Sequence, residues 1–98
     1  MEALMSETMT LNRTVTVVNE NGLHMIPCSL MVRLIKDFQG DVRLSNGQHE
    51  ADCKSMFDLL QLAAAPGTTL SLTVTGEQAE IMAEQISRFF ENGFKLES

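Results

Sequence analysis

The sequence predicts an α+β fold, in which a four-stranded, mainly antiparallel sheet carries three helices on one face as an open-faced sandwich. Strand-like and helix-like hydrophobic patterns follow one another in the order β-α-β-β-α-β-α. The strand-like segments have a single apolar face, so helices are needed on that face only. The chain has 98 residues, 44% of them hydrophobic, which suits one domain with one core.

The first strand is expected at 11–18, where LNRTVTVV is rich in β-branched residues and roughly alternates. We expect residues 1–10 to be a disordered leader and 11–98 to form the single domain. The leader has neither the basic start nor the apolar core of a signal peptide.

The first helix is predicted to begin just after His24. Pro27 then lies in the first helical turn, where its missing N–H is tolerated. Apolar residues recur at helical spacing from there to Gly40, which follows the helix end. These residues are Leu30, Met31, Leu34, Ile35 and Phe38.

The second and third strands, at 41–45 and 48–53, flank Asn46 and Gly47. This dipeptide is typical of a two-residue hairpin turn in which both residues take positive φ. Period-two alternation places the apolar residues of both strands toward the core. These residues are Val42, Leu44, Ala51 and Cys53.

A short second helix is predicted over 55–62, where Ser55 and Asp58 have the spacing of a capping box. The fourth strand follows at 68–75 and alternates cleanly, and the third helix lies within 76–93. The core residues expected from the fourth strand and the third helix are Leu70, Leu72, Val74, Met82, Ile86, Phe89 and Phe90.

Charge and composition exclude several classes of function. The formal net charge is −6 with no cluster of Lys or Arg, so we expect no nucleic-acid partner. The longest apolar stretch is far shorter than a membrane span, so we expect no membrane insertion. Cys28 and Cys53 fit no metal-binding spacing, and we expect no metal and no cofactor. Without a secretion signal, both cysteines are interpreted as reduced thiols in a cytoplasm.

His24 is the candidate functional residue. It occupies a predicted N-cap, where Ser, Thr, Asp or Asn would cap better. A neutral imidazole nitrogen is a nucleophile, and the free N–H groups of a helix N-terminus bind phosphate. We predict that His24 carries a phosphoryl group held by the backbone N–H groups of Ile26 and Cys28, since Pro27 has none. Spacing alone also allows an ordinary surface histidine at a loop–helix junction.

The segment GLHMIPCSLMVRLIKDF resembles the active-site segment of HPr, the histidine phosphocarrier of the bacterial phosphoenolpyruvate-dependent phosphotransferase system. That family reads Gly-[Leu/Ile]-His-Ala-Arg-Pro-Ala before an apolar helix, and Gly22, Leu23, His24 and Pro27 match it. KSMFDLLQL resembles the second motif of the family, and the likeness runs from about residue 11 to about residue 96.

The resemblance implies a bacterial cytoplasmic carrier rather than a self-sufficient enzyme. It implies that enzyme I phosphorylates His24 on a ring nitrogen and that the chain passes the group to an acceptor protein of the enzyme IIA type. The sequence departs from the family at Met25, where HPr has alanine, and at Ile26, where it has arginine. An arginine–phosphate hydrogen bond is worth about 1.5–3 kcal/mol, so we expect transfer to be weakened or to use positive charge from elsewhere.

Apolar side chains near His24 are candidates for a partner interface. Met25 and Ile26 adjoin the N-cap, and we expect both to be exposed. Met56 and Phe57 open the second helix, which lies on the partner-binding face in HPr. For that pair, an interface and an ordinary core position are both open.

Ser55 matches a serine that a regulatory kinase phosphorylates in one branch of the family, which adds such a kinase to the candidate partners. The structural alternative is that Ser55 is simply an N-cap, with Asp58 close enough to repel a phosphate.

Two other functions stay open. One is a regulatory interaction module that keeps the HPr fold but has lost phosphotransfer along with the arginine. The other is a small α/β ligand-binding domain without phosphoryl chemistry.

Overall fold

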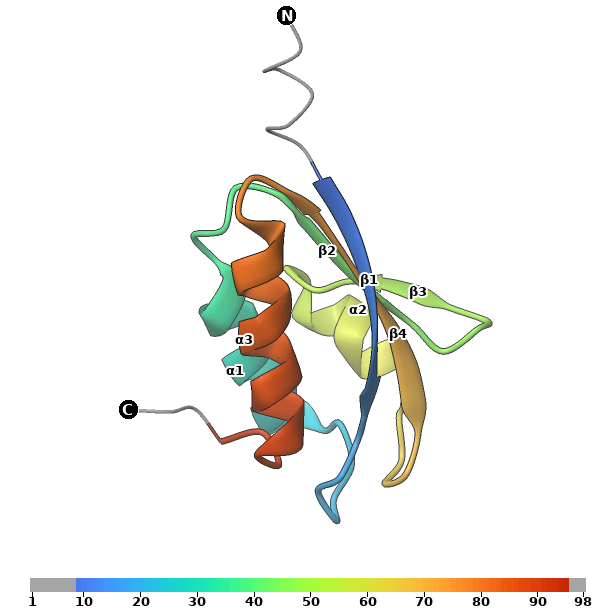
Figure 1. Cartoon of the computed structure of the whole chain (residues 1–98). Coiled ribbons are helices and arrows are strands. Elements are labelled where there is room, and N and C mark those ends of the chain that lie inside the picture. Colours follow the sequence, from blue (N-terminus) through green and yellow to red (C-terminus); the bar gives the residue numbers. More distant parts are fainter. Residues whose placement is uncertain (1–8, 96–98) are drawn as a thin grey trace, which may run out of the picture.

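The computed structural model describes residues 9–95 and contains the seven predicted elements in the predicted order (Figure 1). They are β1 (Met9–Thr16), α1 (Met25–Ile35), β2 (Asp41–Ser45), β3 (Glu50–Asp52), α2 (Met56–Gln61), β4 (Thr69–Gly76) and α3 (Ala79–Glu91). The strands form one sheet in the order β1-β4-β2-β3. All neighbouring strands are antiparallel, and the three helices cover one face of the sheet.

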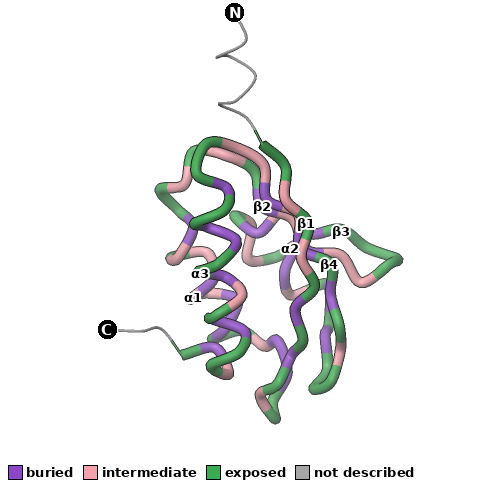
Figure 2. Tube along the Cα trace, in the orientation of Figure 1, coloured by how far each residue is buried: buried purple, intermediate pink, exposed green. Residues whose placement is uncertain are grey.

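The core lies between the sheet and the helices, where the buried positions gather in Figure 2. β4 is central because it pairs with both β1 and β2, and its inward residues Leu70, Leu72 and Val74 are almost fully buried. The core residues predicted for β2, β3, β4 and α3 are all buried. In α1, Met31 and Ile35 are buried, and the other predicted residues are packed against the core.

The first strand begins earlier than expected. β1 runs over Met9–Thr16 rather than 11–18, and Met9 pairs with Gly76 at the end of β4. The length of the partner strand therefore sets the boundary, and Met9 and Thr10 belong to the sheet rather than to the predicted leader. Residues 1–8 of that leader lie outside the described residues.

The hairpin turn is displaced by one residue from the predicted Asn46-Gly47 centre. The Asn46 N–H donates to the His49 carbonyl at 3.2 Å, so Gly47 and Gln48 form the turn. Gly47 has φ +95°, whereas Asn46 is not in the positive-φ region. The Asn46 side-chain oxygen accepts the N–H groups of Gln48 and His49 at 2.8 Å each. Asn46 therefore initiates the turn through its side chain instead of occupying its centre.

The loop that leads to α1 is held against the loop that follows α2. The Val17 N–H donates to the Thr68 carbonyl at 2.9 Å, and the Leu23 N–H donates to the Ala64 carbonyl at 2.9 Å. Between them, Gly22 has φ +73°, and a Cβ built there would lie only 2.7 Å from the Ala64 oxygen. These contacts place the first residue of α1 relative to α2.

Within residues 9–95, no helix is long and apolar enough to cross a membrane.

Replacing Gly22 by alanine should destabilise the protein through its positive φ and through a clash of the added methyl group. Gly67→Ala measures the effect of a positive φ alone. Gly67 also has a positive φ, +88°, but a Cβ there would have no heavy atom within 4 Å. We expect Gly67→Ala to cost about 1–2 kcal/mol of unfolding free energy, from the backbone conformation alone. Gly22→Ala should cost about 1–3 kcal/mol more, because the added methyl displaces the Ala64 carbonyl. Urea denaturation measures both. Equal losses would show that the close approach at Gly22 is unimportant.

Candidate functional site

His24 is the N-cap of α1, as predicted. Its backbone is extended, with φ −98° and ψ −168°, and its side chain makes no capping hydrogen bond. The imidazole is half-buried and has no hydrogen-bond partner among residues 9–95. Its ring nitrogens are therefore not engaged by the described part of the chain.

The first turn of α1 offers two N–H groups without a partner in the described part of the chain, those of Met25 and Ile26. Pro27 has no N–H. The Cys28 N–H donates to the His24 carbonyl at 3.1 Å, which is the first hydrogen bond of the helix. This bond counts against the prediction that the Cys28 N–H holds the phosphoryl oxygens, because that N–H is already used. Met25 was missed, although the first residue of any helix has a free N–H.

The two cysteines are packed in the core. A thiol at a helix N-terminus is expected to have a lowered pKa. In Cys28 burial outweighs this effect and raises the thiol pKa to about 11. Burial also raises the pKa of Cys53, so both thiols stay protonated at neutral pH. Among the described residues, no group of three or more His, Cys, Asp or Glu side chains could hold a metal ion.

Large apolar side chains are exposed on the two helices next to His24. Met25 is 60% exposed and Ile26 is 64% exposed, as expected. α1 packs beside α2, where Phe57 is 80% exposed. Met56 is instead partly buried against the core. Of the two open alternatives, the core position therefore fits Met56, and an exposed interface position fits Phe57. We call Met25, Ile26 and Phe57 the apolar face.

Ser55 is the N-cap of α2, as its spacing predicts. Its hydroxyl accepts the Asp58 N–H at 3.2 Å, and the Asp58 carboxylate accepts the Asp52 N–H at 3.1 Å. Ser55 therefore has a complete structural role as a cap, and Asp58 stands close to it.

Three basic side chains are bonded elsewhere and do not replace the missing arginine beside Ile26. The Lys54 ammonium donates to the Phe38 carbonyl at 2.7 Å, beyond the far end of α1. Arg43 pairs with Asp41 at 3.0 Å, and Arg88 pairs with Glu84 at 3.2 Å.

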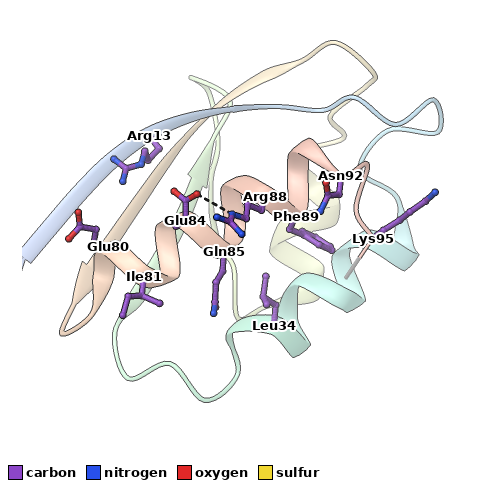
Figure 3. Close-up of a pocket in the computed structure, with 10 residues that line it drawn as sticks. All are labelled: Arg13, Leu34, Glu80, Ile81, Glu84, Gln85, Arg88, Phe89, Asn92 and Lys95. Carbon is purple, nitrogen blue, oxygen red and sulfur yellow. Dashed lines mark hydrogen bonds and ion pairs between the residues drawn. The ribbon is translucent and has the colours of Figure 1, made fainter. Parts of the chain in front are cut away.

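A groove of about 740 Å³ lies along α3, bordered by β1 and the last turns of α1 (Figure 3). Leu34, Ile81 and Phe89 contribute apolar surface to it, and Arg13 and Lys95 are among its charged residues. His24 is not among the residues that line it.

Comparisons with known proteins agree with the fold and identify the family. The family model described as the PTS HPr component phosphorylation site matches residues 11–92. The phosphocarrier protein HPr of Xylella fastidiosa is 32% identical over 84 residues, which cover 86% of this chain and 94% of that protein. The phosphocarrier protein NPr of Escherichia coli K12 is 32% identical over 87 residues, covering 88% and 97%.

Solved structures show the same architecture. HPr of Bacillus anthracis superposes with a TM-score of 0.78 at 25% identity and covers 83% of this chain and 96% of its own. HPr of Thermoanaerobacter tengcongensis has a TM-score of 0.81 at 22% identity and covers 90% and 99%. With its β-α-β-β-α-β-α order, its histidine at the first helix N-cap and relatives that align over nearly their whole length, this chain belongs to the HPr family of phosphocarrier components of the phosphotransferase system.

Proposed function

We propose that this chain accepts a phosphoenolpyruvate-derived phosphoryl group on His24 from enzyme I and passes it to an acceptor protein of the enzyme IIA type in a bacterial cytoplasm. One observation carries the proposal. The unengaged imidazole of His24 stands at a helix N-terminus whose first two N–H groups have no partner within residues 9–95. Such an end attracts a phosphoryl group through its free donors and through the helix dipole.

The transfer needs only His24 and the groups that receive the phosphoryl oxygens. The lone pair of a ring nitrogen attacks phosphorus, and an N–P bond forms. The bond between phosphorus and the donor atom of enzyme I breaks, and its electron pair stays with that atom. The N–H groups of Met25 and Ile26 then hold the oxygens. The same exchange in the opposite sense delivers the group to the acceptor.

The proposed role of the site is that of a carrier rather than of a complete enzyme. The His24 side chain has no acid or base bonded to it among the described residues that would activate water against the phosphoryl group. A phosphoryl group placed there is stored until a partner supplies the next nucleophile.

The apolar face is proposed as the surface that both partners cover. Each partner has to bring its reacting atom to His24, so side chains beside His24 become buried in either complex. Met25, Ile26 and Phe57 are all more than half exposed in the free protein, and exposed apolar groups mark an interface. Met56 would support this surface from below, because it is partly buried and packs against the core.

Ser55 as a kinase site stays a prediction. A phosphate on its hydroxyl would meet the Asp58 carboxylate, and the hydroxyl already caps α2. The structure therefore favours the capping role of Ser55.

Ile26 favours one second candidate, a regulatory interaction module. Without the arginine, the phosphoryl site relies on backbone donors, and the apolar face alone would then define the function. Phosphorylation assays distinguish the two candidates.

Incubation with phosphoenolpyruvate and the cognate enzyme I should add one acid-labile phosphoryl group, detected by intact-mass spectrometry. His24→Ala should lose it, and His49→Ala, which removes the other histidine at an exposed site, should keep it. Ile26→Arg should accelerate loading roughly ten- to a hundredfold, by restoring a charge-assisted hydrogen bond. Loading of Ile26→Arg but not of the wild type would support the interaction module instead.

Phe57→Ala should weaken productive docking without unfolding the protein, because the side chain is 80% exposed. We expect KM for loading to rise roughly tenfold, as for an aromatic anchor at an interface. Ile81→Ala is the matched control, since Ile81 is 57% exposed but lies on α3. If both variants behave as the wild type does, α2 is not part of the docking surface.

A further inference from the structure

All seven Lys and Arg residues of the chain lie in the described region, so every candidate for the missing positive charge can be placed. Lys54, Arg43 and Arg88 are bonded elsewhere, as described above. Arg33 and Lys36 lie in the last turn and at the C-cap of α1, about 14 and 18 Å from His24 along the helix axis at 1.5 Å per residue. Arg13 lies in β1 and lines the groove together with Glu80 and Glu84.

The seventh, Lys95, follows the end of α3, which lies at the same end of the molecule as the start of α1. The two helices run in opposite directions, and the end of α3 is close to the beginning of α1 in Figure 1. Leu34 of α1 and Gln85 of α3 line the same groove. Because the helices are antiparallel, α1 begins and α3 ends at the same end of the molecule, with His24 just before α1 and Lys95 four residues after α3.

A close approach supports this placement. A Cβ built on Gly93 would lie 3.9 Å from the Cβ of Asn19. Asn19 begins the turn that leads to His24, since its carbonyl accepts the Gly22 N–H at 3.1 Å. The segment after α3 therefore lies beside the loop that leads to His24.

The point from which Lys95 projects is well anchored. Phe94 is buried, and its ring centroid lies 5.3 Å from that of Phe89 and 5.0 Å from that of Phe90. Its N–H donates to the Phe89 carbonyl at 2.8 Å, which closes the end of α3. Lys95 itself is exposed, and its ammonium has no hydrogen-bond or ion-pair partner within residues 9–95 (Figure 3). The Lys95 ammonium therefore extends from a backbone position that the buried Phe94 fixes.

We infer that Lys95 supplies the positive charge for the phosphoryl group on His24 that arginine supplies at position 26 in the resembling family. The inference rests on the proposed phosphocarrier function. An ammonium on a flexible stem acts as a point charge, without the paired hydrogen bonds of a guanidinium. Its contribution is therefore smaller than that of an arginine and is more easily screened by salt.

The rate of loading from enzyme I tests the inference in Lys95→Gln, Lys95→Arg and the control Lys36→Gln. Lys36 is an exposed lysine at the opposite end of α1. Lys95→Gln should slow loading roughly two- to tenfold at low salt and remove most of its salt dependence. Lys95→Arg should restore the rate, and Lys36→Gln should change it less than about twofold. Equal rates for Lys95→Gln and Lys36→Gln would overturn the inference.

A second measurement does not need enzyme I. Inorganic phosphate is titrated into each variant while the amide signals of Met25 and Ile26 are followed by NMR. Lys95→Gln should raise the Kd several-fold relative to Lys36→Gln. If enzyme I does not load the wild type but phosphate binding depends on Lys95, the proposed function fails and the role of Lys95 stands. If loading works and neither measurement depends on Lys95, only the inference fails. Absence of both loading and phosphate binding would overturn both.

The two positions should also be coupled. In an Ile26→Arg background, Lys95→Gln should slow loading less than it does alone, because the arginine then neutralises the same charge. Equal effects in both backgrounds would show that Lys95 acts on something other than the phosphoryl group.

Discussion

The site depends on the close contact between the loop before α1 and the loop after α2. Gly22 approaches the Ala64 carbonyl so closely that no side chain fits there, and the Leu23 N–H bonds to the same carbonyl. This contact fixes where α1 begins and hence where His24 stands. It also brings the start of α1, with the candidate nucleophile, close to the end of α2, the short helix that carries the exposed Phe57.

Much of the fold could be predicted because it follows from short-range periodicity. Alternation along β4 identified its buried side, and helical spacing identified the stripe that α3 buries. Features that depend on a neighbouring strand could not be predicted in the same way. β1 begins opposite the last residue of β4, and the side chain of Asn46 moves the turn onto Gly47 and Gln48. The local sequence does not indicate where β1 begins, and the Asn-Gly pattern predicts a turn centred one residue too early.

The same division applies to the site. His24 could be located from its motif and its position before Pro27. The engagement of the Cys28 N–H follows once His24 is the N-cap, because the fourth helical residue donates to the N-cap carbonyl, so the predicted helix start already contained this signal. Lys95 lies 71 positions beyond His24 in the sequence, and only the antiparallel arrangement of α1 and α3 relates the two. Likewise, Met56 and Phe57 are adjacent and both apolar, so only the packing of α2 could distinguish the buried member from the exposed one.

In the proposed cycle, donor and acceptor both dock at His24, which limits how tightly either partner can be held. A donor that covers His24 would also block access of the acceptor, so the two could not be bound at once. The loaded protein would have to leave the first complex before it meets the second. Long residence times would then reduce the flux, and since affinity differences between related complexes reside mostly in the dissociation rate, selection for throughput acts against tight binding. A small, adaptable apolar patch with a methionine beside the histidine suits such brief encounters.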